Sequence, residues 1–144
     1  METNLEIMIE HVKQEARNNL NDDKFLTPKL FVSVIGIEGY AVFLPYLNTR
    51  SQRKDFIFFL NDRISKGTLL EYIFVCEGKY NPFYYSKEEY IFVLHGSIKK
   101  QQQHVCKFYF NEESWLYYTG WNILDGGINP FGDRKEWYDC FSKN

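Results

Sequence analysis

The sequence predicts an α+β fold in which one mainly antiparallel, twisted sheet of five or six strands has helices packed on a face. Two segments, residues 4–20 and 51–66, carry apolar residues at helical spacing. The remaining segments are rich in β-branched and aromatic residues, which favour strands. The predicted order is helix, two strands, helix, three strands, a possible further strand and a final helix. This order is typical of α+β domains.

Length and composition predict a single domain over residues 1–144. The chain has 144 residues, of which 44% are hydrophobic and 25% charged, as in ordinary globular proteins. This length is sufficient to bury a substantial core. Because no linker, repeat or change in composition divides the sequence, we expect one α+β unit.

The first helix is predicted over residues 4–20. Its apolar residues recur at steps of three and four and so share one face: Leu5, Met8, Ile9, Val12, Ala16 and Leu20. Thr3 and Glu6 have the spacing of a capping box, which satisfies amides left free by the first turn. We expect residues 21–23 to end this helix.

A strand pair follows at residues 29–37 and 40–46. Glu38 and Gly39 between these segments suit a two-residue hairpin turn. Pro45 lacks an amide donor and therefore marks the end of the pairing.

The second helix is predicted over residues 51–66. Thr49 or Ser51 can cap its start, and Gly67 can adopt the left-handed conformation that ends many helices. Its predicted core stripe is Phe56, Ile57, Leu60 and Ile64. At about 100° per residue, Phe58 points away from that stripe, so we expect it to be exposed.

Three further strands are predicted at residues 68–78, 89–96 and 104–110, and a possible sixth at 115–121. The continuous apolar run of the first of these is typical of a central strand. Residues 122–132 resemble a loop. A short final helix, with Asp133 and Glu136 as its capping box, is expected after them.

Charge and hydropathy disfavour nucleic acid and membrane as partners. The formal net charge is −2 and the basic residues are scattered, whereas proteins that bind a phosphate backbone have concentrated positive charge. No apolar run approaches the roughly 20 residues that span a bilayer. The first residues lack the basic and apolar regions of an export signal, so we expect a cytoplasmic protein.

No motif for a cofactor is present. The three cysteines, Cys76, Cys106 and Cys140, are widely spaced and form no C-x-x-C pair. Neither glycine-rich phosphate-binding pattern occurs. We therefore expect no cofactor, no metal and no catalytic residue that a motif could identify.

His95, His104 and Cys106 are the candidates for chemistry. A two-residue loop at Lys99–Lys100 would place His95 opposite His104, and a four-residue loop would place it opposite Cys106. In both cases the three side chains share one face of the sheet. Imidazole and thiolate suit zinc, and Cys76 could add a ligand. The spacing matches no standard site, however, so we favour a structural role.

Aromatic residues make up 19% of the chain, which is high, and several are candidates for a binding surface. Trp115, Tyr117 and Trp121 alternate and would line one face of a strand. Tyr84 and Tyr85 lie in a tyrosine-rich loop, where we expect an exposed edge. Together with Phe58 these residues form the predicted binding site, because large aromatics are enriched at interface hot spots.

The leading hypothesis is a small regulatory or protein-binding protein, of the inhibitor, immunity or mobile-element accessory type. Its partner would be another protein or a second copy of itself, giving a homodimer or larger homo-oligomer. One alternative is a small metal- or thiol-dependent enzyme centred on His95, His104 and Cys106. Another is a small-ligand pocket lined by Trp115, Tyr117 and Trp121, which could stack on a ring.

Overall fold

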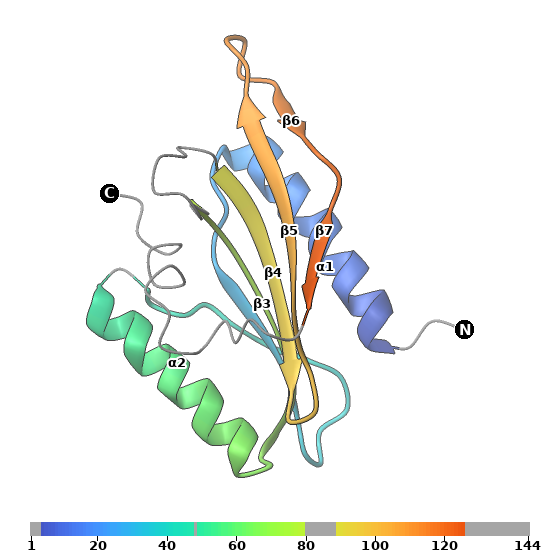
Figure 1. Ribbon diagram of the computed structural model, residues 1–144, viewed down its shortest axis with the longest axis vertical. Coiled ribbons are helices and arrows are strands. Elements are labelled where there is room, and N and C mark those ends of the chain that lie inside the picture. The colour runs from blue at the N-terminus through green and yellow to red at the C-terminus, as the bar shows by residue number, and fades with distance from the viewer. Residues whose placement is uncertain (1–3, 48, 80–88, 126–144) are drawn as a thin grey trace.

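In the part of the chain that the structure describes, one antiparallel sheet has a helix on each face (Figure 1). The computed structural model describes residues 4–47, 49–79 and 89–125. Its elements are α1 (Asn4–Asp23), β1 (Lys29–Val34), β2 (Ala41–Phe43), α2 (Arg50–Ser65), β3 (Leu69–Lys79), β4 (Glu89–Ser97), β5 (Gln101–Phe110), β6 (Leu116–Tyr118) and β7 (Asn122–Asp125). The predicted final helix lies outside the described residues. Within the described part of the chain, no helix has the length and apolar character needed to cross a membrane.

The seven strands follow the order β2-β1-β3-β4-β5, and both β6 and β7 pair with β5. Every pairing is antiparallel. This arrangement confirms the predicted fold class, an α+β domain with a mainly antiparallel sheet. It also places β3 and β4 at the centre, as the apolar run of β3 predicted.

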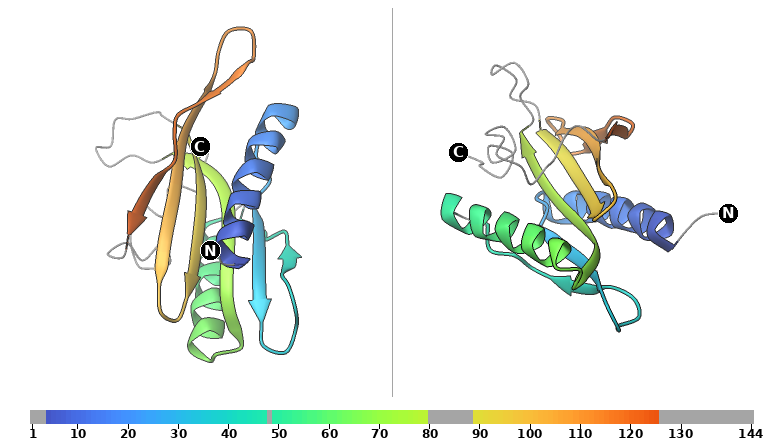
Figure 2. Two further views of the ribbon diagram at one scale, coloured as in Figure 1. Left: turned by 90° about the vertical axis from the view of Figure 1, so that its right-hand side faces the viewer. Right: turned by 60° about the horizontal axis from the view of Figure 1, so that its bottom comes forward.

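The two helices cover opposite faces of the sheet, whereas the sequence led us to expect helices on a face (Figure 2). Alternate residues of β3 point to opposite sides, because side chains alternate along a strand. Tyr72 and Phe74 pack in the core beneath α2, and Ile73 and Val75 pack in the core beneath α1. The domain therefore has two hydrophobic cores that share the central strands.

The apolar face of α1 packs as predicted, with Ile9, Val12, Ala16 and Leu20 buried. The helix continues to Asp23, beyond its predicted end. Lys24 stops it with a left-handed backbone, φ 65°, and donates its amide to the Leu20 carbonyl at 2.9 Å. Because the helix ends only at Lys24, residues 21–23, which were expected to end it, are still helical.

The start of α2 is fixed by a capping box. Thr49 accepts a hydrogen bond from the Gln52 amide, and the Gln52 side chain accepts one from the Thr49 amide. Gly67 follows the helix with φ 73°, as expected for a C-terminal glycine. Phe56 packs against Phe74 of β3 with ring centroids 4.9 Å apart, which anchors α2 to the sheet.

Two predictions of local structure are wrong, one about a turn and one about a strand. The β1–β2 ladder ends at Val32 and Ala41, so residues 35–40 form a longer loop than the predicted turn at Glu38–Gly39. Gly36 and Gly39 both have positive φ in this loop, which allows two successive changes of direction.

The second wrong prediction concerns residues 115–121, which do not form one strand. Thr119 donates its amide to the Lys107 carbonyl at 2.9 Å, and its hydroxyl accepts from the Lys107 amide at 3.2 Å. The threonine side chain thus replaces a ladder bond and separates β6 from β7. Residues 122–125, expected as loop, form β7 instead.

Candidate functional site

His95, His104 and Cys106 share one face of the sheet, as predicted, and the structure shows that α1 covers this face. The loop position was wrong, because Ser97 and Lys100 close a turn around residues 98–99. His95 therefore pairs with Gln102, and neither His104 nor Cys106 lies opposite it. Since the register differs by two residues from one predicted register and by four from the other, both even numbers, the side chains still share a face.

The two histidines form a close pair beneath α1. Their ring centroids are 5.2 Å apart and both side chains are buried. Nε2 of His95 lies 2.8 Å from Oε1 of Gln102, a hydrogen-bond distance. Burial lowers the pKa of His95, and this effect is opposed by the Gln102 hydrogen bond. His95 is therefore neutral at neutral pH.

Cys106 is held as a thiol. Its Sγ donates to the Thr119 carbonyl at 3.1 Å, and Nη2 of Arg17 lies 3.9 Å from the same sulfur. Burial raises the pKa of Cys106, although Arg17 opposes this. Because a thiolate is the reactive form, these surroundings do not favour a nucleophile.

The alternative of a metal site at His95, His104 and Cys106 finds no support in the part of the chain that the structure describes. No group of three His, Cys, Asp or Glu side chains there could hold a metal ion. The Cys76 side chain packs in the core beneath α2, on the other face of the sheet from His95 and His104. Two imidazoles alone are fewer ligands than zinc requires.

Two cations of α1 that sequence reasoning missed lie beside this cluster. Lys13 is only 7% exposed, forms an ion pair with Glu10, and places Nζ 5.0 Å from the ring centroid of Trp121. The guanidinium of Arg17 lies 4.0 Å from the ring centroid of Tyr118. The sequence signal for this pair was that Lys13 and Arg17 are four residues apart and lie next to the apolar stripe of the helix.

Trp121 consequently packs against the α1 core and does not join Trp115 and Tyr117 on one face. The prediction of a shared face is wrong, because the interruption at Thr119 changes which side the later residues occupy. Tyr117 instead stacks on Tyr109, with centroids 5.3 Å apart and rings 10° from parallel.

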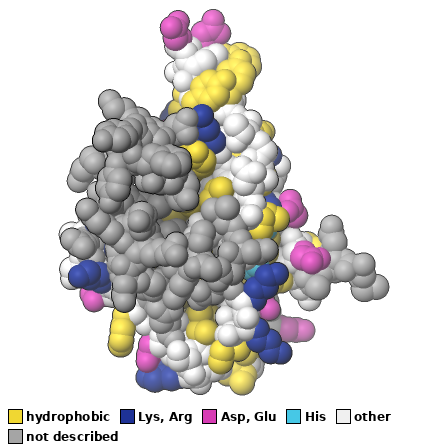
Figure 3. Space-filling model, in the orientation of Figure 1, with side chains coloured by type: hydrophobic (Ala, Val, Ile, Leu, Met, Phe, Trp, Pro, Cys, Tyr) yellow, Lys and Arg dark blue, Asp and Glu magenta, His cyan; other side chains and the backbone are white. Residues whose placement is uncertain are grey.

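Trp115 and Tyr117 belong to the exposed tip of the β5–β6 hairpin, residues 109–117, which we call the tip. Trp115 is 65% exposed, and the hydrophobic side chains of the tip are visible at the top of Figure 3. Phe58 is 72% exposed, as predicted, but it lies on α2, away from the tip (Figure 1). Tyr84 and Tyr85 lie outside the described residues.

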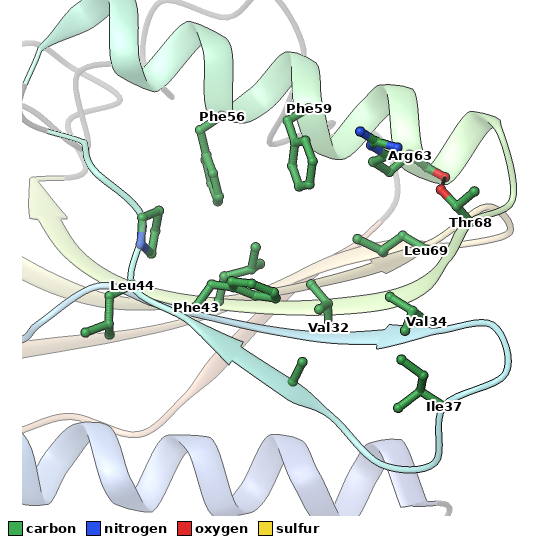
Figure 4. Close-up of a pocket in the computed structure, with 13 residues that line it drawn as sticks. Val32, Val34, Ile37, Phe43, Leu44, Phe56, Phe59, Arg63, Thr68 and Leu69 are labelled. Carbon is green, nitrogen blue, oxygen red and sulfur yellow. Dashed lines mark hydrogen bonds between the residues drawn. The ribbon is translucent and has the colours of Figure 1, made fainter.

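An apolar groove lies between α2 and the β1–β2 hairpin. We call it the groove; its volume is about 650 Å³. It is lined by Leu30, Val32, Val34, Ile37, Ala41, Phe43, Leu44, Pro45, Phe56, Phe59, Arg63, Thr68 and Leu69. Figure 4 shows Phe56 and Phe59 directed from α2 toward the strands, with Phe43 below them. The groove is lined mainly by phenylalanine and aliphatic side chains, and Trp115, Tyr117 and Trp121 are not among its lining residues.

The groove exists because β2 is a short edge strand that contributes nothing to the core. All three of its residues are exposed, and β2 pairs only with β1 among the described strands. Phe59 lies beside the core stripe of α2 and faces this opening, where it is 43% exposed. The adjacent Phe58 and Phe59, and the apolar residues around Phe43, were the sequence signal for this site.

Arg63 provides the single positive charge among the described residues that line the groove. Its guanidinium lies 5.3 Å from the ring centroid of Phe59, and its backbone carbonyl accepts a hydrogen bond from the Thr68 hydroxyl at 3.1 Å. Arg63 and Thr68 are at the same end of the groove in Figure 4. The site therefore combines an apolar floor with a cation at one end.

Comparison of the chain with models of protein families, with curated proteins and with solved structures finds no significant match.

Proposed function

We propose that this protein is a small binding protein that holds a hydrophobic segment of a polypeptide in the groove. The observation that carries the proposal is the apolar groove of about 650 Å³ between α2 and the β1–β2 hairpin. Concave apolar surfaces with a few polar groups are the usual binding sites of proteins. Large exposed apolar patches mark interaction surfaces, because water is a poor solvent for them.

The extent of the apolar surface favours a polypeptide over a small ligand. Large hydrophobic side chains outside the groove are more than half exposed on α2 and in the loops that follow β1 and β2: Ile35, Tyr46 and Phe58. A small molecule seated in the groove would leave these side chains in water. A polypeptide can cover them together with the groove, and would bury more apolar surface.

The outer edge of β2 supports the same proposal. Edge strands present unpaired backbone groups, and proteins usually protect them with charged residues or proline. The sequence of β2 is Ala-Val-Phe, and the structure leaves these side chains exposed. An incoming segment can therefore gain backbone hydrogen bonds in addition to apolar contacts.

Photo-crosslinking of the full chain in the cells that express it tests this proposal. A photoreactive amino acid replaces Leu44 in the groove, which is 62% exposed. The matched control carries it at Ile7 of α1, on the opposite face, which is 52% exposed. We expect light-dependent adducts with a polypeptide from position 44 and none from position 7.

A second change shows whether the adduct depends on the groove. Phe59→Ser in the chain labelled at position 44 should lower the adduct yield by about tenfold or more, since aromatic hot spots contribute at least about 2 kcal/mol. The proposal is wrong if position 44 gives no polypeptide adduct, or if both positions give the same adducts.

A further inference from the structure

We infer that the segment held in the groove is the tip of a second copy of this chain. This inference rests on the proposed function and specifies its partner. The tip offers exposed rings that can fill the groove and carboxylates that can meet its cation.

The tip combines aromatic side chains with negative charge. Tyr109, Tyr117 and Trp115 are all about half exposed or more. Glu112 and Glu113 are exposed at the turn, where Figure 3 shows acidic side chains at the extreme end of the molecule. Exposed aromatics next to carboxylates suit an apolar groove with a positively charged end.

The helix that forms one wall of the groove has the opposite charge from the tip. Within Arg50–Ser65 there are four basic and two acidic residues, although the whole chain has a net charge of −2. One of these acids, Asp62, forms an ion pair with Lys66. Arg63 remains directed to the groove, where it can meet Glu112 or Glu113 of another copy.

The tip is already ordered for binding. Oδ1 of Asn111 accepts hydrogen bonds from the amides of Glu113 and Trp115, both at 2.9 Å. In the turn itself, Nζ of Lys24 donates to the Ser114 carbonyl at 3.0 Å. A turn held in this way loses little conformational entropy on association, so more of the contact energy contributes to affinity.

The tip cannot fill the groove of its own chain. In Figure 1 the β5–β6 hairpin projects at one end of the long axis. The β1–β2 loop and the end of α2, next to Arg63 and Thr68, lie at the other end. The contact is therefore between copies and joins two different surfaces, which is a heterologous, head-to-tail association.

Mixing two single variants tests this contact, with mass measured by light scattering. Leu44→Asp disables the groove and leaves the tip intact, while Trp115→Ser does the reverse. Both side chains are exposed, so we expect both variants to fold, which circular dichroism checks. Each variant alone should be a monomer at concentrations where the wild type is larger. The mixture should form dimers and nothing larger, because only one productive contact exists.

A charge exchange provides the second test. Arg63→Glu should weaken wild-type association by about tenfold or more, and adding Glu113→Arg to the same chain should restore it, since the attraction returns with reversed sign. Ile7→Asp is the control and should assemble like the wild type. The inference is overturned if the wild type stays monomeric, or if the mixture of the two single variants does too. If position 44 then crosslinks to a different polypeptide, the proposed function is still supported although this inference is wrong.

Discussion

The pKa of His95 depends on the position of this residue between α1 and the sheet. Charged groups from three elements face it: Lys13 from α1, Lys100 from the β4–β5 turn and Glu71 from β3. Burial has the largest effect and disfavours the imidazolium form, so the folded protein holds the His95 proton less tightly than the unfolded chain does.

This difference predicts a loss of stability in acid. Because the folded pKa is lowered, the contribution of His95 is fully present above the unfolded pKa of about 6.5 and decreases as pH falls below it. His95→Gln should make the free energy of unfolding less dependent on pH in this range, as measured by urea denaturation. His11→Gln, at an exposed position of α1, is the control. Equal pH dependence in the wild type and His95→Gln would contradict the prediction.

At the residue scale, sequence reasoning succeeded where sidedness alone was needed. The exposure of Phe58 followed from helical geometry, and the shared face of His95 and His104 followed from strand alternation. The position of Trp121 could not be predicted, because it depends on the bond between Thr119 and Lys107 across the sheet.

The elements depend on their ends as much as on their apolar stripes. α2 begins with the reciprocal hydrogen bonds of Thr49 and Gln52, and the sequence had left Thr49 and Ser51 as alternative caps. For this reason α1 and α2 were predicted to within a few residues. The β1–β2 loop was not, because its length depends on where the ladder with β1 ends.

Removal of the cap should be measurable. Thr49→Ala should lower the free energy of unfolding by about 1 kcal/mol, because the Gln52 amide loses its acceptor. Ser51→Ala is the matched control and should change stability by less than about 0.5 kcal/mol. Both are measured by chemical denaturation at one pH. Equal losses for the two variants would show that Thr49 is not the cap.

At the scale of the whole molecule, the stability of the strands should differ from centre to edge. β3 and β4 are covered by a helix layer on each face, and nearly all of their core residues are fully buried. β2 has only exposed residues. Strand order could be predicted in part from these apolar runs. The face that each helix takes could not, because nothing in the apolar stripe of either helix specifies one side of the sheet.

Hydrogen exchange tests this gradient. We expect the amides of β3 and β4 to exchange only through global unfolding, and those of β2 to exchange through local opening at a much faster rate. The Leu44→Asp variant is used so that a bound partner does not protect β2. Mass spectrometry of proteolytic fragments measures the rates. Uniform protection across the sheet would contradict the expectation.

The tip and the Arg63 end of the groove lie at opposite ends of the long axis, so the molecule has a direction. A row of copies joined in this way would have a free tip at one end and an empty groove at the other. The number of copies in the row would increase with protein concentration, because a head-to-tail contact need not close into a ring. One copy with a blocked end would then stop growth, so a small amount of capped chain could limit a large assembly.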